Sequence, residues 1–183
     1  MEIKPLKLQG SYEITLNPRR DDRGYFMRIY DEEIFKESGL TVNWVQENQS
    51  LSKKKGIVRG LHFQKPPHSE TKLVRVVMGE ILDVFVDLRK NSPTYGQWDA
   101  IKLSESNQKA VYIPKGFAHG FCTIEAPALV LYKVDCSYHP ESEGGIFWND
   151  ESIGIKWPIE TPSYISKKDS NLGSLKEFSS PFV

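Results

Sequence analysis

The sequence has little of several features that mark particular classes of protein. It has two cysteines, Cys122 and Cys136, and their spacing fits no C-x-x-C metal pattern. Its 24 basic and 24 acidic residues balance, so it has no basic excess for a nucleic-acid or anionic membrane surface. No apolar run approaches the roughly 20 residues that span a bilayer, and no charged-then-apolar leader is visible. We therefore expect a soluble cytoplasmic protein with reduced thiols, without nucleic-acid or membrane partners.

The length of the chain and the spacing of its Gly and Pro residues favour one mostly-β domain. The 183 residues fit a single domain over 1–183, since neither an internal repeat nor a linker interrupts them. One convincing helix is expected from Asp31 to Ser38, with Asp31 as its cap. Short strands between Gly and Pro residues are typical of a β-sandwich or barrel. The expected strands are 12–16, 44–50, 72–78, 81–88, 100–103, 110–113 and 128–134, with 72–78 and 81–88 joined by a tight hairpin across Gly79-Glu80.

A few polar residues in this frame are candidates for chemistry. In Arg59-Gly60-Leu61-His62-Phe63 the histidine lies between two large apolar residues. Such a histidine is more often packed in a core than catalytic, so the pattern alone leaves both interpretations open. Arg23 can be a solvated turn charge or a phosphate contact. Gln46 and Asn48, at i and i+2 of a strand, share one face.

Two motifs resemble those of cupin jelly-roll barrels. Pro114-x-Gly-x-x-His119 resembles the second cupin motif. In the first motif, the expected His-x-His pair is reduced to His62-Phe63-Gln64, and Lys72 stands where a metal-binding glutamate is expected. The resemblance implies a mostly-β jelly-roll barrel or sandwich with a few short helices. The ligands that remain are too few for a mononuclear site, so we expect neither a metal ion nor another cofactor.

The full set of motifs closely resembles the dTDP-4-dehydrorhamnose 3,5-epimerases over nearly the whole chain. The matching segments, in chain order, are Arg23–Phe26, Gln46–Asn48, Val58–Gln64, Lys72–Val74, Asp83–Arg89, Pro114–Phe121 and Trp157-Pro158. The resemblance implies epimerisation at C3 and C5 of dTDP-4-dehydro-6-deoxy-D-glucose, by proton abstraction next to the C4 ketone, in dTDP-L-rhamnose biosynthesis.

The resemblance also implies a role for each catalytic residue. His62 matches the base, and an unperturbed histidine suits that work near neutral pH. Tyr132 matches the acid that reprotonates from the opposite face. We infer that Lys72 supplies the charge that stabilises the enolate oxygen. Asp169 matches the carboxylate that orients His62, and Asp83 is a second candidate for that role.

Ten further residues are implied to contact the substrate. Arg23 and Arg59 match diphosphate contacts, and Tyr138 matches an aromatic that stacks on thymine. In the family the Arg23 segment reaches the neighbouring subunit's site, which implies a homodimer. Arg28 replaces a common family glutamate, which leaves the nucleotide base open. The full set is Arg23, Phe26, Gln46, Glu47, Asn48, Arg59, His119, Tyr138, Glu143 and Lys168.

Three alternatives remain at this point. One is an epimerase that inverts a single carbon, C3 or C5, or acts on another nucleotide-linked 4-ketosugar. Another is a metal-dependent cupin oxygenase, which the missing ligands disfavour. The third is a sugar-nucleotide-binding barrel without catalysis, which needs no acid and base on either side of a cation. The sequence does not decide between one inversion and two.

Overall fold

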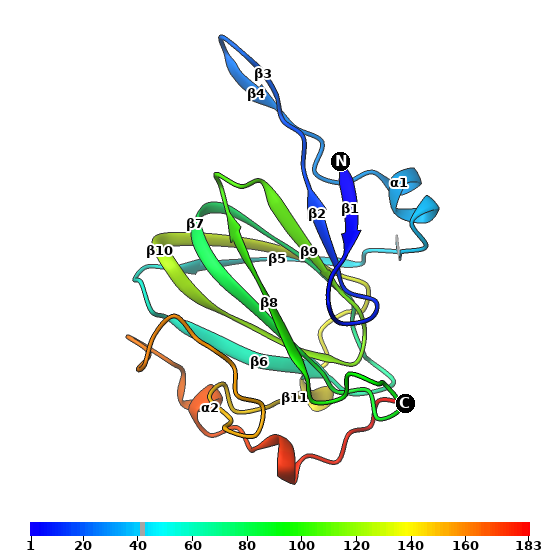
Figure 1. Ribbon diagram of the computed structural model, residues 1–183, viewed down its shortest axis with the longest axis vertical. Helices are drawn as coiled ribbons and strands as arrows, with labels where there is room; N and C mark the ends of the chain where they lie inside the picture. The colour runs from blue at the N-terminus through cyan, green and yellow to red at the C-terminus, as the bar shows by residue number, and fades with distance from the viewer. Residues whose placement is uncertain (41–42) are drawn as a thin grey trace.

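The computed structural model describes residues 1–40 and 43–183. Within them, nine strands form one antiparallel sheet and two form a separate hairpin, as the prediction of a mostly-β fold with short helices requires (Figure 1). The strands of the main sheet are β1 (Glu2–Pro5), β2 (Tyr12–Thr15), β5 (Gln46–Ser52), β6 (Val58–Gln64), β7 (Lys72–Asp87), β8 (Trp98–Ser104), β9 (Lys109–Ile113), β10 (Phe117–Val134) and β11 (Glu143–Gly145).

The long strands β7 and β10 hold the two layers of the fold together. At one end of the pair, β7 also pairs with β9 and β10 with β5. At the other end, β7 pairs with β8 and β10 with β6. β7 and β10 also pair with each other along almost their whole length. Because both strands pass from one layer to the other, the sheet folds over on itself and encloses a hydrophobic core.

The predicted hairpin across Gly79-Glu80 is wrong. β7 runs through both residues as one strand, and β10 likewise joins two segments that look separate in the sequence. Gly79 has φ +75°, and a Cβ atom there would lie 2.5 Å from the Pro127 carbonyl oxygen. The register between β7 and β10 shifts at this point. The glycine therefore allows a β-bulge and a close approach of the β10 backbone, and it does not reverse the chain.

Alternating side chains of these strands build the core beneath the site. Val74 and Phe85 of β7 and Phe121 and Val130 of β10 are buried in one cluster. Tyr132 is partly buried and packs against the same cluster. Burying a residue of this size is worth about 1.5–3 kcal/mol, so this cluster also fixes the strands that carry the polar site residues.

Short helices lie outside the sheet. Helix α1 (Glu32–Glu37) confirms the predicted helix, and the Asp31 side chain accepts from Ile34 N–H at its start. Helix α2 (Lys167–Ser170) was predicted only as a polar tail. Two 3-10 turns are η1 (Pro140–Ser142) and η2 (Leu175–Glu177). In the part of the chain that the structure describes, no helix is long and apolar enough to cross a membrane.

The second sheet is a small arm. Strands β3 (Arg19–Asp21) and β4 (Gly24–Phe26) pair only with each other among the described strands. The arm projects away from the main sheet (Figure 1), and Phe26, which pairs with Arg19 at the base of the arm, is 68% exposed. Tyr25 on the same strand is 54% exposed, so the arm presents two large aromatic residues next to each other in the sequence.

Candidate active site

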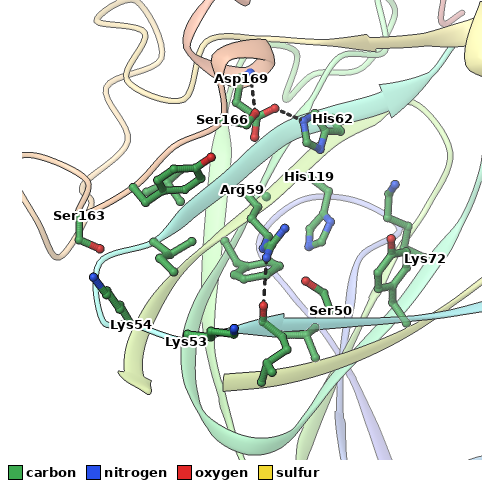
Figure 2. A pocket seen from close by; sticks show the side chains of 18 residues that line it. Ser50, Lys53, Lys54, Arg59, His62, Lys72, His119, Ser163, Ser166 and Asp169 are labelled. Carbon is green, nitrogen blue, oxygen red and sulfur yellow. Dashed lines mark hydrogen bonds and ion pairs between the residues drawn. The ribbon is translucent and has the colours of Figure 1, made fainter. Parts of the chain in front are cut away.

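Two adjoining cavities open into the folded sheet. The larger has a volume of about 610 Å³ and the smaller about 260 Å³. His62, Lys72 and Tyr132 line both cavities. The three residues expected to carry the chemistry therefore lie where the two cavities meet, and they come from strands β6, β7 and β10. Figure 2 shows His62 and Lys72 among the side chains that line the larger cavity.

Glycines allow β6 and β10 to approach closely beside this junction. Gly60 has φ +118°, and a Cβ atom there would lie 2.6 Å from the Gly120 Cα. The pairing of the two strands puts His62 opposite His119. Two histidines that are expected to contact the substrate thus lie opposite each other on neighbouring strands of the cavity wall.

The His62 ring is held by Asp169. The ring Nε2 lies 2.8 Å from Asp169 Oδ1, and Gly60 N–H donates to Asp169 Oδ2 across 3.0 Å. Burial alone would raise the pKa of Asp169, but the bonds from His62 and Gly60 outweigh it and lower that pKa. An ionised Asp169 accepts the Nε2 proton, which leaves the basic lone pair of His62 on Nδ1.

Asp83, the other candidate partner of His62, contacts His119 instead. His119 Nε2 lies 2.8 Å from Asp83 Oδ2, and the Asp83 side chain is fully buried. Burial raises the pKa of Asp83, and the nearby His119 and Lys72 only partly offset this. Among the described residues, Asp83 Oδ1 has no hydrogen-bond partner. Two histidines of the larger cavity therefore each have an aspartate partner, and the pKa of Asp169 is lowered whereas that of Asp83 is raised.

Lys72 and Tyr132 both face the junction, and Glu70 is a neighbour of each. The Lys72 ammonium is 2.5 Å from Glu70 Oε1, and both side chains are nearly buried. Burial, followed by the Glu70 charge, raises the pKa of the Tyr132 phenol. Tyr132 therefore stays protonated at neutral pH, as a proton donor must. The sequence analysis did not single out Glu70, although it lies at i−2 from Lys72, on the same face of an extended chain.

The predicted polar contacts gather at the smaller cavity. Gln46, Asn48, Tyr138 and Glu143 line it, and Gln46 Nε2 donates to Asn48 Oδ1 across 2.9 Å. The Tyr138 hydroxyl donates to Glu143 across 2.8 Å, and Lys168 forms an ion pair with the same carboxylate. This end offers both an exposed aromatic ring and polar groups to a ligand.

Arg59 and His119 line the larger cavity. The Arg59 guanidinium bonds to Ser52 Oγ and the Leu51 carbonyl, so neither of its partners is an acid. Its positive charge therefore remains available to an anionic ligand. Lys53 and Lys54 lie at the same end of this cavity (Figure 2).

Four of the ten predicted contacts do not line either cavity of this chain, and one of them, Lys168, reaches the smaller cavity only through its ion pair with Glu143. Arg23 and Phe26 are on the β3–β4 arm, where Arg23 is 90% exposed and forms an ion pair with Asp21. Glu47 lies between Gln46 and Asn48 on β5, so it points to the opposite face, where it pairs with Lys133.

One group of potential metal ligands occurs in the described chain, outside the junction. His68, His139 and Glu141 each have a ligand atom within 4.8 Å of the others. The two imidazole rings are stacked, with centroids 3.5 Å apart and an angle of 6° between planes. A metal ion bound by an imidazole nitrogen lies near that ring's plane. One ion cannot lie in two parallel planes, so this arrangement is a ring stack rather than a formed metal site.

Comparison with known proteins agrees with this geometry. A family model described as dTDP-4-dehydrorhamnose 3,5-epimerase matches residues 5–177. The chain is 49% identical over 172 residues to the Methanothermobacter thermautotrophicus dTDP-4-dehydrorhamnose 3,5-epimerase, covering 93% of this chain and 92% of that protein. It is 39% identical over 178 residues to a dTDP-4-dehydrorhamnose 3-epimerase from Streptomyces niveus, covering 97% and 85%.

A solved structure is similar over the same range. The Bacillus anthracis dTDP-4-dehydrorhamnose 3,5-epimerase, with TDP and PPi bound, superposes with a TM-score of 0.92 at 41% identity. The similarity covers 95% of this chain and 99% of that one. It therefore includes the strands that carry both cavities.

Proposed function

The chain belongs to the dTDP-4-dehydrorhamnose 3,5-epimerase family, and we propose that it performs the family's double inversion with His62, Lys72 and Tyr132. It is an isomerase of dTDP-L-rhamnose biosynthesis. The single observation that supports these three roles is the meeting of a base, a cation and a phenol at the junction of two cavities.

His62 is the base in this proposal. A proton on a carbon next to the C4 ketone becomes acidic when the ketone oxygen can take the resulting negative charge. His62 accepts that proton on Nδ1, since Asp169 holds Nε2. The carboxylate also stabilises the imidazolium that forms, and Gly60 N–H keeps the carboxylate in place.

Lys72 and Tyr132 complete the reaction. The Lys72 ammonium stabilises the negative charge on the C4 oxygen of the enolate. Tyr132 then donates its proton to the carbon from the face opposite His62, which inverts the centre. After one inversion His62 holds the abstracted proton and Tyr132 is a phenolate, so exchange with solvent must restore both before the second carbon reacts.

The dTDP moiety extends over the polar residues around the junction. Arg59 contacts the diphosphate, Tyr138 stacks on the thymine ring, and the ion pair of Glu143 with Lys168 adds polar contacts beside Tyr138. The neighbour with bound TDP supports a thymidine nucleotide as the ligand.

The site is shared in a homodimer. The β3–β4 arm of one chain carries Arg23 and Phe26 to the cavity of its partner, which explains why both side chains are exposed in the single chain. The arm then adds a cation and an aromatic ring at the nucleotide end of the neighbouring site. Such an exchange is reciprocal, because a two-fold dimer presents the same surfaces twice.

A single-centre epimerase is the second candidate. Its support is the Streptomyces niveus relative, which is named as a 3-epimerase and matches nearly the whole chain. The same base, cation and acid serve either reaction, so the residues at the junction do not separate them. Whether one carbon or two are inverted depends on whether the sugar can present C5 to His62 after C3 has reacted.

Solvent exchange tests the proposal directly. In heavy water the wild-type enzyme is expected to place deuterium at both C3 and C5 of the product of dTDP-4-dehydro-6-deoxy-D-glucose, as read by NMR. His62→Asn should exchange neither carbon. Tyr132→Phe keeps the base, so it should exchange deuterium with retained configuration while inverting slowly. Deuterium at one carbon alone would identify a single-centre epimerase, and exchange by His62→Asn would contradict the assigned base.

A further inference from the structure

The Lys72 ammonium has a carboxylate partner that is itself anchored. Glu70 Oε1 lies 2.5 Å from Lys72 Nζ, and Gln64 Nε2 lies 3.2 Å from Glu70 Oε2. The exposed fractions of the Lys72 and Glu70 side chains are 9% and 12%, so this ion pair is largely removed from water. It sits at the smaller cavity, beside His62 and Tyr132.

Gln64 ties the pair to two other segments. Its Nε2 lies within hydrogen-bond distance of the carbonyl oxygens of His68 and Ser137, and its Oε1 accepts from His139 N–H. The Gln64 side chain is 3% exposed and comes from β6, two residues after His62. The same strand therefore carries the base and the amide that fixes the lysine's partner.

We propose that Glu70 is a positioning residue for the epimerisation, which holds the Lys72 ammonium where the enolate oxygen forms, with Gln64 as its anchor. The inference rests on the proposed role of Lys72. A lysine side chain has several rotatable bonds, and its charge stabilises a transition state best when it is already in place. Glu70 removes that freedom before substrate arrives.

The pair leaves Lys72 competent to act on substrate. An ammonium has three N–H donors, and the Glu70 carboxylate occupies one direction only. The carboxylate also helps keep Tyr132 protonated, since burial and then the Glu70 charge raise the pKa of that phenol. One carboxylate thus holds the cation in place and helps keep the acid protonated.

Two substitutions at position 70 separate positioning from charge. Glu70→Gln keeps an oxygen acceptor for Lys72 and loses the negative charge, so we expect its turnover to stay within about 5-fold of wild type. Glu70→Leu removes the acceptor, so kcat should fall about 10-fold or more, with a smaller change in KM. Glu13→Leu, which breaks the Glu13–Lys109 pair away from both cavities, is the matched control and should leave kcat unchanged.

A double-mutant cycle gives the decisive reading. If Glu70 acts through Lys72, then adding Glu70→Leu to Lys72→Met should lower kcat by less than about 2-fold. The double variant should also recover thermal stability that Glu70→Leu alone loses, because it no longer buries an unpaired ammonium. Losses that multiply, or a Glu70→Leu enzyme with wild-type kcat, would overturn the inference.

The cycle also distinguishes this inference from the proposed function. Full turnover by Lys72→Met alone would contradict the role of Lys72 itself. A large loss in Lys72→Met together with no loss in Glu70→Leu would leave that role intact and reject only the positioning by Glu70. If Glu70→Leu does not fold, Glu70→Gln and the double variant still provide the comparison.

Discussion

His119 Nε2 lies 2.8 Å from Asp83 Oδ2, and Nε2 of His62, opposite it on the neighbouring strand, lies 2.8 Å from Asp169 Oδ1. The two pairs have similar geometry but different surroundings. Asp169 receives a second bond from Gly60 N–H, whereas one oxygen of the fully buried Asp83 has no partner among the described residues. The pKa of Asp169 is therefore lowered and that of Asp83 is raised, which predicts opposite effects of their removal.

Asp169→Asn is expected to lower both stability and turnover at neutral pH. A carboxyl group with a lowered pKa stabilises the folded state above its ordinary pKa, and this contribution is lost as the pH falls through the folded value. The melting temperatures of variant and wild type should therefore converge below 3.8, the ordinary value for Asp. Thermal unfolding across this pH range, with kcat at neutral pH, measures both effects. A constant gap at all pH values would contradict the electrostatic explanation.

Asp83→Asn should have the opposite effect on stability. Because the pKa of Asp83 is raised, its contribution is fully present below 3.8 and is lost as the pH rises through the folded value. The variant should thus melt at a higher temperature than wild type at neutral pH, with no such advantage in acid. Turnover should fall, because His119 loses the carboxylate that orients it. The same melting series records the stability difference, and a less stable variant at neutral pH would refute it.

Lys72→Met should lose turnover far more than substrate binding. A charge directed at a developing enolate oxygen stabilises the transition state more than the ground state, and removing one such donor costs roughly 100-fold or more in rate. Steady-state kinetics should show the loss in kcat, with KM changed only a few fold. Lys133→Met is the control, since Lys133 pairs with Glu47 on the outer face of β5 and β10. Near-normal kcat in Lys72→Met would remove it from the mechanism.

Arg23→Ala and His62→Ala should complement each other in mixed dimers. With an exchanged arm, each homodimer lacks either Arg23 or the base at both sites and should be nearly inactive. In a mixed dimer, the intact His62 of one chain meets the intact arm of the other at one of two sites. Random mixing gives half mixed dimers, so about one quarter of wild-type activity should return after co-expression. No recovery, in a dimer confirmed by light scattering, would show that the arm serves its own chain.

Local motifs were enough to identify the residues at the junction. Resemblance placed His62, Lys72 and Tyr132 in one site, and the structure brings them to the same two cavities. Resemblance matched Asp169 to His62, as the structure has it, but the residues alone left Asp83 as a second candidate, because the paired positions lie 36 and 107 residues apart. Such pairings depend on strand registers that no local pattern determines.

Two local signals were misleading or overlooked. Gly79 was interpreted as a hairpin turn, but its positive φ serves a bulge inside β7, where β10 continues alongside. A turn and a bulge require the same backbone freedom, so the residue type does not separate them. Glu70 could have been found from its i−2 spacing to Lys72, but an acid two residues before a lysine usually lies on a solvated surface.

The bonds from Asp169 to His62 and Gly60 close loops of more than one hundred residues. Contacts between such distant positions form slowly, because the chain must lose much of its conformational freedom before they can be made. During synthesis β6 leaves the ribosome well before α2, so the imidazole exists long before its carboxylate partner. We therefore expect the oriented form of His62 to appear only once the C-terminal segment that carries Asp169 has docked against β6.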